Sequence, residues 1–143
     1  MRHGVPIAEN LKKRLQGYVF SRPFMGERVP QHVQNLIIRE YCERNGLHYL
    51  LSATEYAMED CHLILKQVLD DLFQIDGIVA YSMFQLPEDI DERQRVYSTV
   101  LAQNKSLHFA VEGLQMSTGL EQDRIETLWR IRQILPLCAQ TVA

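Results

Sequence analysis

The stretch Gly17-Tyr18-Val19-Phe20-Ser21-Arg22-Pro23 decides how the rest of the chain is interpreted. Its aromatic and β-branched run, from Tyr18 to Phe20, is bounded by a glycine and a proline, which is typical of a buried strand. A turn-rich loop follows, and a helix is expected to begin near Pro30 because the fixed φ of proline suits a first helical position. Strand, polar loop and helix in this order form the first half of an α/β unit.

The same alternation continues along the chain. Further apolar runs predict strands at Leu47–Ala53, Ile75–Tyr81 and Leu107–Val111. Amphipathic stretches predict helices from 30 to the Asn45-Gly46 stop, from an N-cap at Asp60 to 72, from 90 to about 104, and from 119 to 135, where Pro136 should end the helix. Four strands that alternate with helices imply right-handed crossovers and a parallel sheet covered on both faces.

We therefore predict one α/β domain over residues 1–143, a three-layer parallel sheet of about four strands. Residues 1–16 are expected to form an N-terminal extension, with a short helix over 7–15 as the alternative. With 46% hydrophobic and 23% charged residues, the composition is that of an ordinary soluble globular protein.

Charge and motifs exclude several classes of function. The net charge is −3, so no overall positive field attracts nucleic acid. No apolar run reaches the roughly 20 residues that span a bilayer, and no signal-peptide core follows Met1–Pro6. The 3 cysteines lie far apart, which favours reduced thiols and a cytoplasmic location. Metal-ligand spacings, a Walker loop and a Gly-x-Gly-x-x-Gly run are absent from the sequence, so we expect no metal and no cofactor.

The candidate site follows from the predicted sheet, because the carboxyl ends of parallel strands meet at one edge and ligands bind there. The helix from Pro30 would direct its free N–H groups to the same edge, flanked by Arg22 and Arg28, which suits an anionic ligand. We expect the substrate-binding residues at this edge to be Arg22, Arg28, Gln31, Gln34, Asn35, Tyr56, Ser82, Gln85 and Glu112.

Three residues near this edge are catalytic candidates, each with a structural alternative. Ser21 is a nucleophile or a turn former. Glu55 is a general base beside an arginine, or it caps the following helix. His32 lies in the first turn of a helix, whose dipole would lower its pKa, or it is a surface residue. His108, inside an apolar strand, is expected to be a hydrogen-bonded sheet histidine, and Cys61 a buried apolar thiol.

Some of these residues resemble the catalytic domain of serine recombinases of the resolvase type. The matching positions are Gly17-Tyr18, Gln34, Tyr41-Cys42, Asn45-Gly46 and Ile75–Val79. This resemblance covers residues 17–112 and implies the resolvase fold and dimerisation. The sequence differs from that family at the catalytic residues. Phe84 and Gln85 occupy the positions of the family's essential aspartate and arginine, and the spacing from Tyr18 to Ser21 is one residue shorter than in the family's pattern.

A second resemblance is to the sporadic carbohydrate cluster proteins, a small bacterial family. It is carried by residues 21–26, 29–35, 51–58, 75–79 and 107–110 and spans about 17–114. Members of that family look like products of accessory genes found among those for surface polysaccharide or O-antigen synthesis. The resemblance therefore implies a pathway context and no particular reaction.

Three functions follow as hypotheses. In the first, a cytoplasmic protein of surface-carbohydrate biosynthesis binds a phosphorylated or nucleotide-linked sugar at the strand ends. In the second, a non-catalytic scaffold or regulatory subunit pairs with a neighbouring biosynthetic enzyme. The third is a recombinase-derived nucleic-acid protein, which the net charge and the Phe84-Gln85 replacement disfavour.

Overall fold

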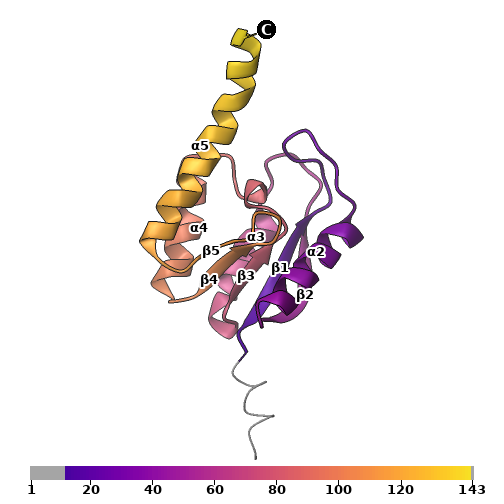
Figure 1. Cartoon of the computed structure of the whole chain (residues 1–143). Coiled ribbons are helices and arrows are strands. Elements are labelled where there is room, and N and C mark those ends of the chain that lie inside the picture. Colours follow the sequence, from indigo (N-terminus) through magenta and orange to yellow (C-terminus); the bar gives the residue numbers. More distant parts are fainter. Residues whose placement is uncertain (1–11, 143) are drawn as a thin grey trace, which may run out of the picture.

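The computed structural model describes residues 12–142, with side chains described up to residue 135. One sheet contains all the described strands, in the order β2-β1-β3-β4-β5 (Figure 1). The strands are β1 (Arg14–Phe20), β2 (His48–Glu55), β3 (Gly77–Ala80), β4 (Ser106–Phe109) and β5 (Leu114–Met116). The first four are mutually parallel, as predicted, whereas β5 pairs antiparallel with β4.

Helices cover both faces of this sheet and complete the predicted three-layer α/β fold (Figure 1). They are α2 (Gln31–Arg44), α3 (Leu63–Asp70), α4 (Ile90–Ala102) and α5 (Gly119–Val142), with 3₁₀ turns η1 (Leu72–Gln74) and η2 (Met83–Gln85). No helix within residues 12–142 combines the length and the apolar composition that a bilayer crossing requires.

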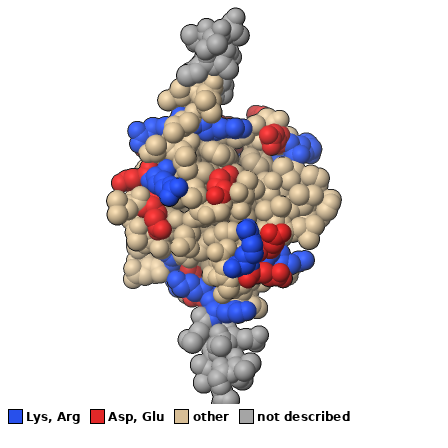
Figure 2. Space-filling model, in the orientation of Figure 1, with Lys and Arg blue, Asp and Glu red and all other residues tan. Residues whose placement is uncertain are grey.

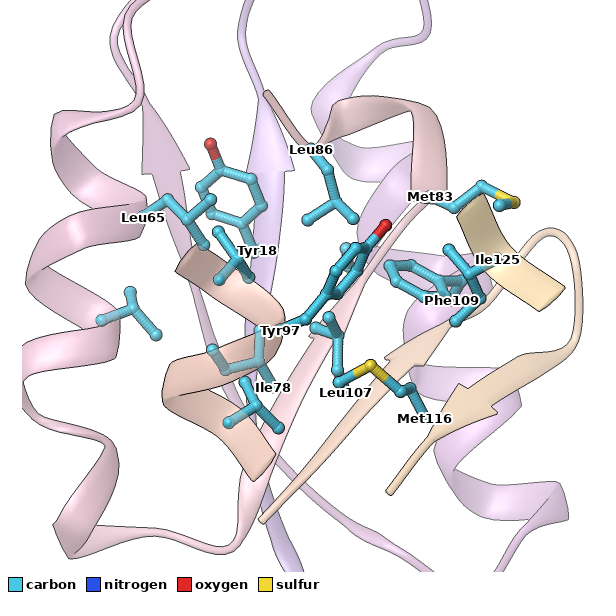
Figure 3. Close-up of a cluster of buried hydrophobic side chains, with 14 of the residues drawn as sticks. Tyr18, Leu65, Ile78, Met83, Leu86, Tyr97, Leu107, Phe109, Met116 and Ile125 are labelled. Carbon is cyan, nitrogen blue, oxygen red and sulfur yellow. The ribbon is translucent and has the colours of Figure 1, made fainter. Parts of the chain in front are cut away.

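The larger hydrophobic core lies between the sheet and the helices α3, α4 and α5. In Figure 3, side chains from these helices meet side chains from β1, β3 and β4, among them Tyr18, Leu65, Ile78, Tyr97, Phe109 and Ile125. A smaller core on the opposite face packs α2, through Ile38 and Tyr41, against Val19 and Val79 of the sheet. Every residue of β3 is buried, because a central parallel strand is covered on both faces.

Strand β1 begins earlier than the sequence indicated, so Gly17 lies inside it and does not precede it. The register against β2 shifts between Gln16 and Gly17. A Cβ atom at Gly17 would overlap the hydroxyl of Ser52, so glycine allows the two strands to approach at this irregularity.

Other boundaries were predicted wrongly for identifiable reasons. Of the proposed helix over 7–15, Arg14 and Leu15 belong to β1, and residues 1–11 lie outside the described part. Asp60 does not cap α3, which begins at Leu63. Helix α5 does not end before Pro136 but continues to Val142, because proline removes one backbone hydrogen bond, which a long helix can lose without ending. The three residues of β5 are too few to show a periodicity.

His108 is a hydrogen-bonded sheet histidine, as predicted. Its Nδ1 lies 2.8 Å from the Tyr41 hydroxyl of α2, and its Nε2 lies 2.8 Å from the Ser106 hydroxyl. Burial lowers the pKa of His108 from 6.5 to about 4; the charge of Lys13 adds to this effect and Glu121 opposes it. The neutral imidazole therefore ties α2 to β4.

We expect this histidine to make stability depend on pH. The unfolded chain takes up the proton near pH 6.5 and the folded chain only near pH 4, so stability should fall as pH is lowered through this interval. At pH 4 the loss amounts to about 3 kcal/mol, at 1.36 kcal/mol per unit of pKa shift. Urea unfolding across this range should show the slope in the native chain and in a control His32→Gln variant. An equal slope in His108→Gln would contradict the assignment.

Candidate functional site

Polar side chains do gather at the carboxyl edge of the parallel strands, but most of them bind one another. Gln34 is fully buried, and its amide oxygen accepts hydrogen bonds from the Phe20 N–H (3.0 Å) and from Gln85 Nε2 (2.8 Å). Its amide nitrogen donates to the carbonyls of Phe20 and Val29, both at 2.9 Å. Gln34 thus fixes the end of β1 to α2, and Gln85 reinforces it, so neither amide faces a substrate.

Of the two roles considered for Glu55, general base or helix cap, the structure shows the cap: Glu55 caps α3. One oxygen accepts from the Tyr18 hydroxyl (2.7 Å) and the Leu65 N–H (3.1 Å), and the other from the Ile64 N–H (3.0 Å) and the Tyr56 N–H (3.1 Å). Burial raises the pKa of Glu55, but these hydrogen bonds outweigh it and leave the pKa below its ordinary value. An ionised carboxylate that is only 1% exposed and bonded on both oxygens is a cap and not a general base.

Ser82 and Glu112 also serve the backbone. The Ser82 hydroxyl donates to Glu112 Oε2 (2.7 Å) and accepts from the Phe84 N–H (3.2 Å), while Glu112 Oε1 accepts from the Met83 N–H (3.0 Å). Together they hold η2 after β3. The half-buried Ser21 hydroxyl likewise donates to the Glu55 carbonyl (3.0 Å), which is what a turn former does.

The expected anion site at the start of α2 is not assembled. The exposed side chains of Gln31, His32 and Arg28 make no hydrogen bond within the described residues, and the Asn35 side chain only accepts one from the Tyr49 hydroxyl (3.3 Å). Arg22 lies on the other side of the sheet from α2, with its guanidinium carbon 4.1 Å from the centre of the Phe20 ring. Arg22 follows the end of β1, and its hydrogen bonds to the carbonyls of Tyr56 and Cys61 and its contact with Phe20 place it on the α3 side.

On that side the loops after β1, β2 and β3 enclose a pocket of about 450 Å³, which we call the Arg22 pocket. The Arg22 side chain is 9% exposed, and its Nη1 donates to the carbonyls of Tyr56 (2.8 Å) and Cys61 (2.9 Å). No carboxylate within the described residues forms a salt bridge with it. Its hydrogen-bond partners among the described residues are therefore backbone carbonyls, and the guanidinium has no direct ion pair there.

His62 forms another wall of the Arg22 pocket and was not among the residues predicted from the sequence. Its Nε2 lies 3.2 Å from the Gln85 carbonyl, which can only accept, so Nε2 carries the proton. Nδ1 is then an acceptor, and it is buried without a hydrogen bond in the described chain. Burial and the nearby charge of Arg22 lower the pKa of His62, so the imidazole is neutral at pH 7.

The remaining walls combine aromatic rings with carboxylates. Phe20, Phe24 and Phe84 line the Arg22 pocket, and the Phe20 and Phe24 rings meet edge to face at 5.7 Å. The carboxylates are those of Glu59, Asp60 and Glu88, which are exposed and make no ion pair within residues 12–135.

The aromatic rings and the carboxylates, which accept hydrogen bonds from hydroxyl groups, suit a ligand with a hydroxyl-bearing ring. An anionic group of the same ligand would lie at Arg22. Among the residues that the structure describes, no three His, Cys, Asp or Glu side chains gather closely enough to hold a metal ion.

No protein-family model matches this sequence, and no curated protein is significantly similar to it. The solved structures that share the fold include the following two. The N-terminal catalytic domain of TP901-1 integrase is 13% identical with a TM-score of 0.55, over 86% of this chain and 98% of that one. A resolvase family site-specific recombinase from Streptococcus pneumoniae is 9% identical with a TM-score of 0.59, over 90% and 98% of the two chains. The chain therefore has a resolvase-like α/β fold, as expected, and at these identities the likeness concerns the fold alone.

Proposed function

We propose that this protein binds a phosphorylated or nucleotide-linked sugar in the Arg22 pocket. The observation that carries the proposal is the buried Arg22 guanidinium, which has no carboxylate partner in the described chain and lies in an aromatic-lined pocket. A phosphate oxygen would compensate its charge through a charge-assisted hydrogen bond. The Phe24 and Phe84 rings offer faces for the apolar side of a sugar.

The carboxylates of the pocket favour a sugar phosphate over a bare phosphate or polyphosphate. Glu59, Asp60 and Glu88 outnumber Arg22, so a bare polyphosphate would be repelled. Carboxylates accept hydrogen bonds from sugar hydroxyls, and the His62 Nδ1 lone pair can accept one as well. These groups therefore favour the sugar phosphate over the phosphate alone, and we propose binding without assigning a reaction.

The pathway context belongs to the same proposal. The resemblance to sporadic carbohydrate cluster proteins supports a cytoplasmic role in surface polysaccharide or O-antigen biosynthesis. It rests on residues 21–26 and 51–58 among others, which include the β1 and β2 loops of the Arg22 pocket.

A second candidate is a scaffold role, and it is favoured by apolar side chains on α5. Ile131, Ile134 and Leu135 are 48%, 53% and 53% exposed, on a helix that projects beyond the sheet (Figure 1). Under this alternative, polar substitutions at these positions would abolish partner binding while leaving sugar binding intact.

Nucleic-acid binding is the weakest candidate. On the face drawn in Figure 2, blue and red groups are interspersed, and no broad basic surface forms outside the grey residues. DNA binding depends on several clustered cations, and the net charge of the chain is −3. A gel-shift assay at low and high salt would test it.

Calorimetric titration with glucose 1-phosphate, galactose 1-phosphate and N-acetylglucosamine 1-phosphate tests the main proposal. At least one of them should bind, and Phe24→Ala should weaken that binding about 5-fold, because ring stacking contributes about 1 kcal/mol. Phe73→Ala is the matched control, since Phe73 is 67% exposed and lies outside the pocket. If no sugar phosphate binds, or if the Phe24 and Phe73 variants bind alike, the proposal fails.

A further inference from the structure

A second pocket, of about 280 Å³, lies between α3 and α4, and we call it the α3–α4 groove. Its apolar lining includes Leu65, Leu69 and Val96. One cation comes from each helix, Lys66 from α3 and Arg95 from α4, and neither forms a salt bridge within the described residues. Two carboxylates, Asp70 and Glu92, also line the groove.

The groove adjoins the Arg22 pocket at a single side chain. His62 lines both. The backbone that faces His62 is also shared, because Leu86 and Glu88 line the Arg22 pocket while Pro87, between them, lines the groove. The hydrogen bond between His62 Nε2 and the Gln85 carbonyl joins α3 to this backbone, so the imidazole stands at the junction of the two cavities.

We infer that the two pockets form one bipartite site for a nucleoside diphosphate sugar. This inference rests on the proposed function and extends it. The sugar occupies the Arg22 pocket, the diphosphate crosses the His62 junction, and the nucleoside lies in the α3–α4 groove.

Charge and shape support this order along the site. Arg22 lines the pocket on one side of His62, and Lys66 and Arg95 line the groove on the other, so a diphosphate at the junction would have cations on both sides. These charges offset part of the repulsion that the carboxylates of the two pockets exert on a diphosphate. The apolar lining of the groove fits the faces of a base, and Asp70 and Glu92 can accept hydrogen bonds from ribose hydroxyls or base N–H groups. The unbonded His62 Nδ1 can accept a hydroxyl hydrogen at the point where sugar and phosphate meet.

Backbone amide chemical shifts of the full chain would test the inference with separate parts of the ligand. The probes are UDP, CDP, GDP and ADP as nucleotides, glucose 1-phosphate, galactose 1-phosphate and N-acetylglucosamine 1-phosphate as sugars, and UDP-glucose as a joined ligand. A nucleoside diphosphate should shift the amides of Lys66, Leu69 and Arg95, and a sugar phosphate those of Met25, Ala57 and Phe84.

Substitution adds a second measurement. The double variant Lys66→Ala/Arg95→Ala should weaken binding of the joined ligand at least 10-fold while leaving sugar phosphate binding unchanged. Arg39→Ala/Arg124→Ala, which removes the same charge from exposed positions of α2 and α5, should change neither.

The outcomes separate the two proposals. If a sugar phosphate shifts the Arg22-pocket amides but no nucleoside diphosphate shifts the groove, the bipartite site is overturned and sugar binding remains. Unchanged binding of the joined ligand by the Lys66/Arg95 variant also overturns the bipartite site alone. If no probe shifts either pocket, both proposals are overturned.

Discussion

Replacing Glu126 by leucine is expected to lower the free energy of unfolding by about 3–5 kcal/mol, because it leaves a buried guanidinium without its counter-ion. Arg93 and Glu126 join α4 to α5 with side chains only 1% and 4% exposed. Arg93 Nε and Nη2 both donate to the carboxylate, the latter at 2.8 Å, and the Tyr97 hydroxyl donates to it at 2.8 Å. The hydrogen bond from Arg93 holds the pKa of Glu126 below its ordinary value despite burial.

This ion pair also supports the candidate site. Arg93 Nη1 donates to the carbonyls of Pro87 and Glu88, both at 3.0 Å, and these residues line the two pockets. The guanidinium lies 4.3 Å from the centre of the Trp129 ring, and the Trp129 indole donates to the Met83 carbonyl (3.0 Å). A Glu126→Leu variant that still folds should therefore bind sugar phosphates more weakly.

Two comparisons isolate the buried charge in urea unfolding experiments. The double variant Arg93→Met/Glu126→Leu should recover most of the lost stability, since an apolar pair removes the uncompensated charge. Glu40→Ala breaks the exposed pair with Arg44, whose side chains are 69% and 63% exposed, and should cost less than about 1 kcal/mol. If Glu126→Leu costs no more than Glu40→Ala, the assignment of the pair is wrong.

Replacing Glu55 by alanine should cost about 3–4 kcal/mol, because it leaves the N–H groups of Ile64, Leu65 and Tyr56 and the Tyr18 hydroxyl without their acceptor. These groups lie at the start of α3, after the end of β2 and on β1, so Glu55 joins three elements. Glu43→Ala, on the exposed surface of α2, is the matched control and should change stability by less than about 0.5 kcal/mol.

The pH dependence gives an independent measurement for Glu55. Its folded pKa lies below the ordinary 4.5, so its stabilisation is fully present above about pH 4.5 and is lost as the pH falls through the lower folded value. Glu55→Gln should remove this part of the acid slope. A Glu55→Ala variant as stable as Glu43→Ala, yet deficient in a sugar-dependent reaction, would restore the general-base hypothesis.

The order of strands and helices could be predicted from the sequence, because each element has its own local pattern of apolar and turn-forming residues. The aromatic run at Tyr18–Phe20 and the apolar run at Ile75–Tyr81 indicate buried strands, and Pro30 and Asn45-Gly46 bracket α2. The alternation of strands and helices then implies a parallel sheet. Because a parallel sheet brings its carboxyl ends together, the polar edge with Gln34, Glu55 and Gln85 was also predictable.

What these polar residues do at that edge was decided only by tertiary structure. Most donors and acceptors that Gln34 and Glu55 meet are distant in sequence, such as Ile64, 9 positions from Glu55, and Gln85, 51 positions from Gln34. No local pattern says whether an amide or a carboxylate finds such partners. Arg22 lies beyond the end of β1, so strand parity does not place it, and its position beside Phe20 depends on carbonyls 34 and 39 positions away.

The sequence by itself determined the α/β class and the edge of the sheet at which the candidate site lies, because hydrophobic periodicity and chain order are local properties. Only the tertiary structure decided that the site is built from Arg22, Phe24, His62 and Phe84. Three loops must meet in space to enclose a pocket, and a side chain is available to a ligand only after the folded chain has satisfied its own buried polar groups.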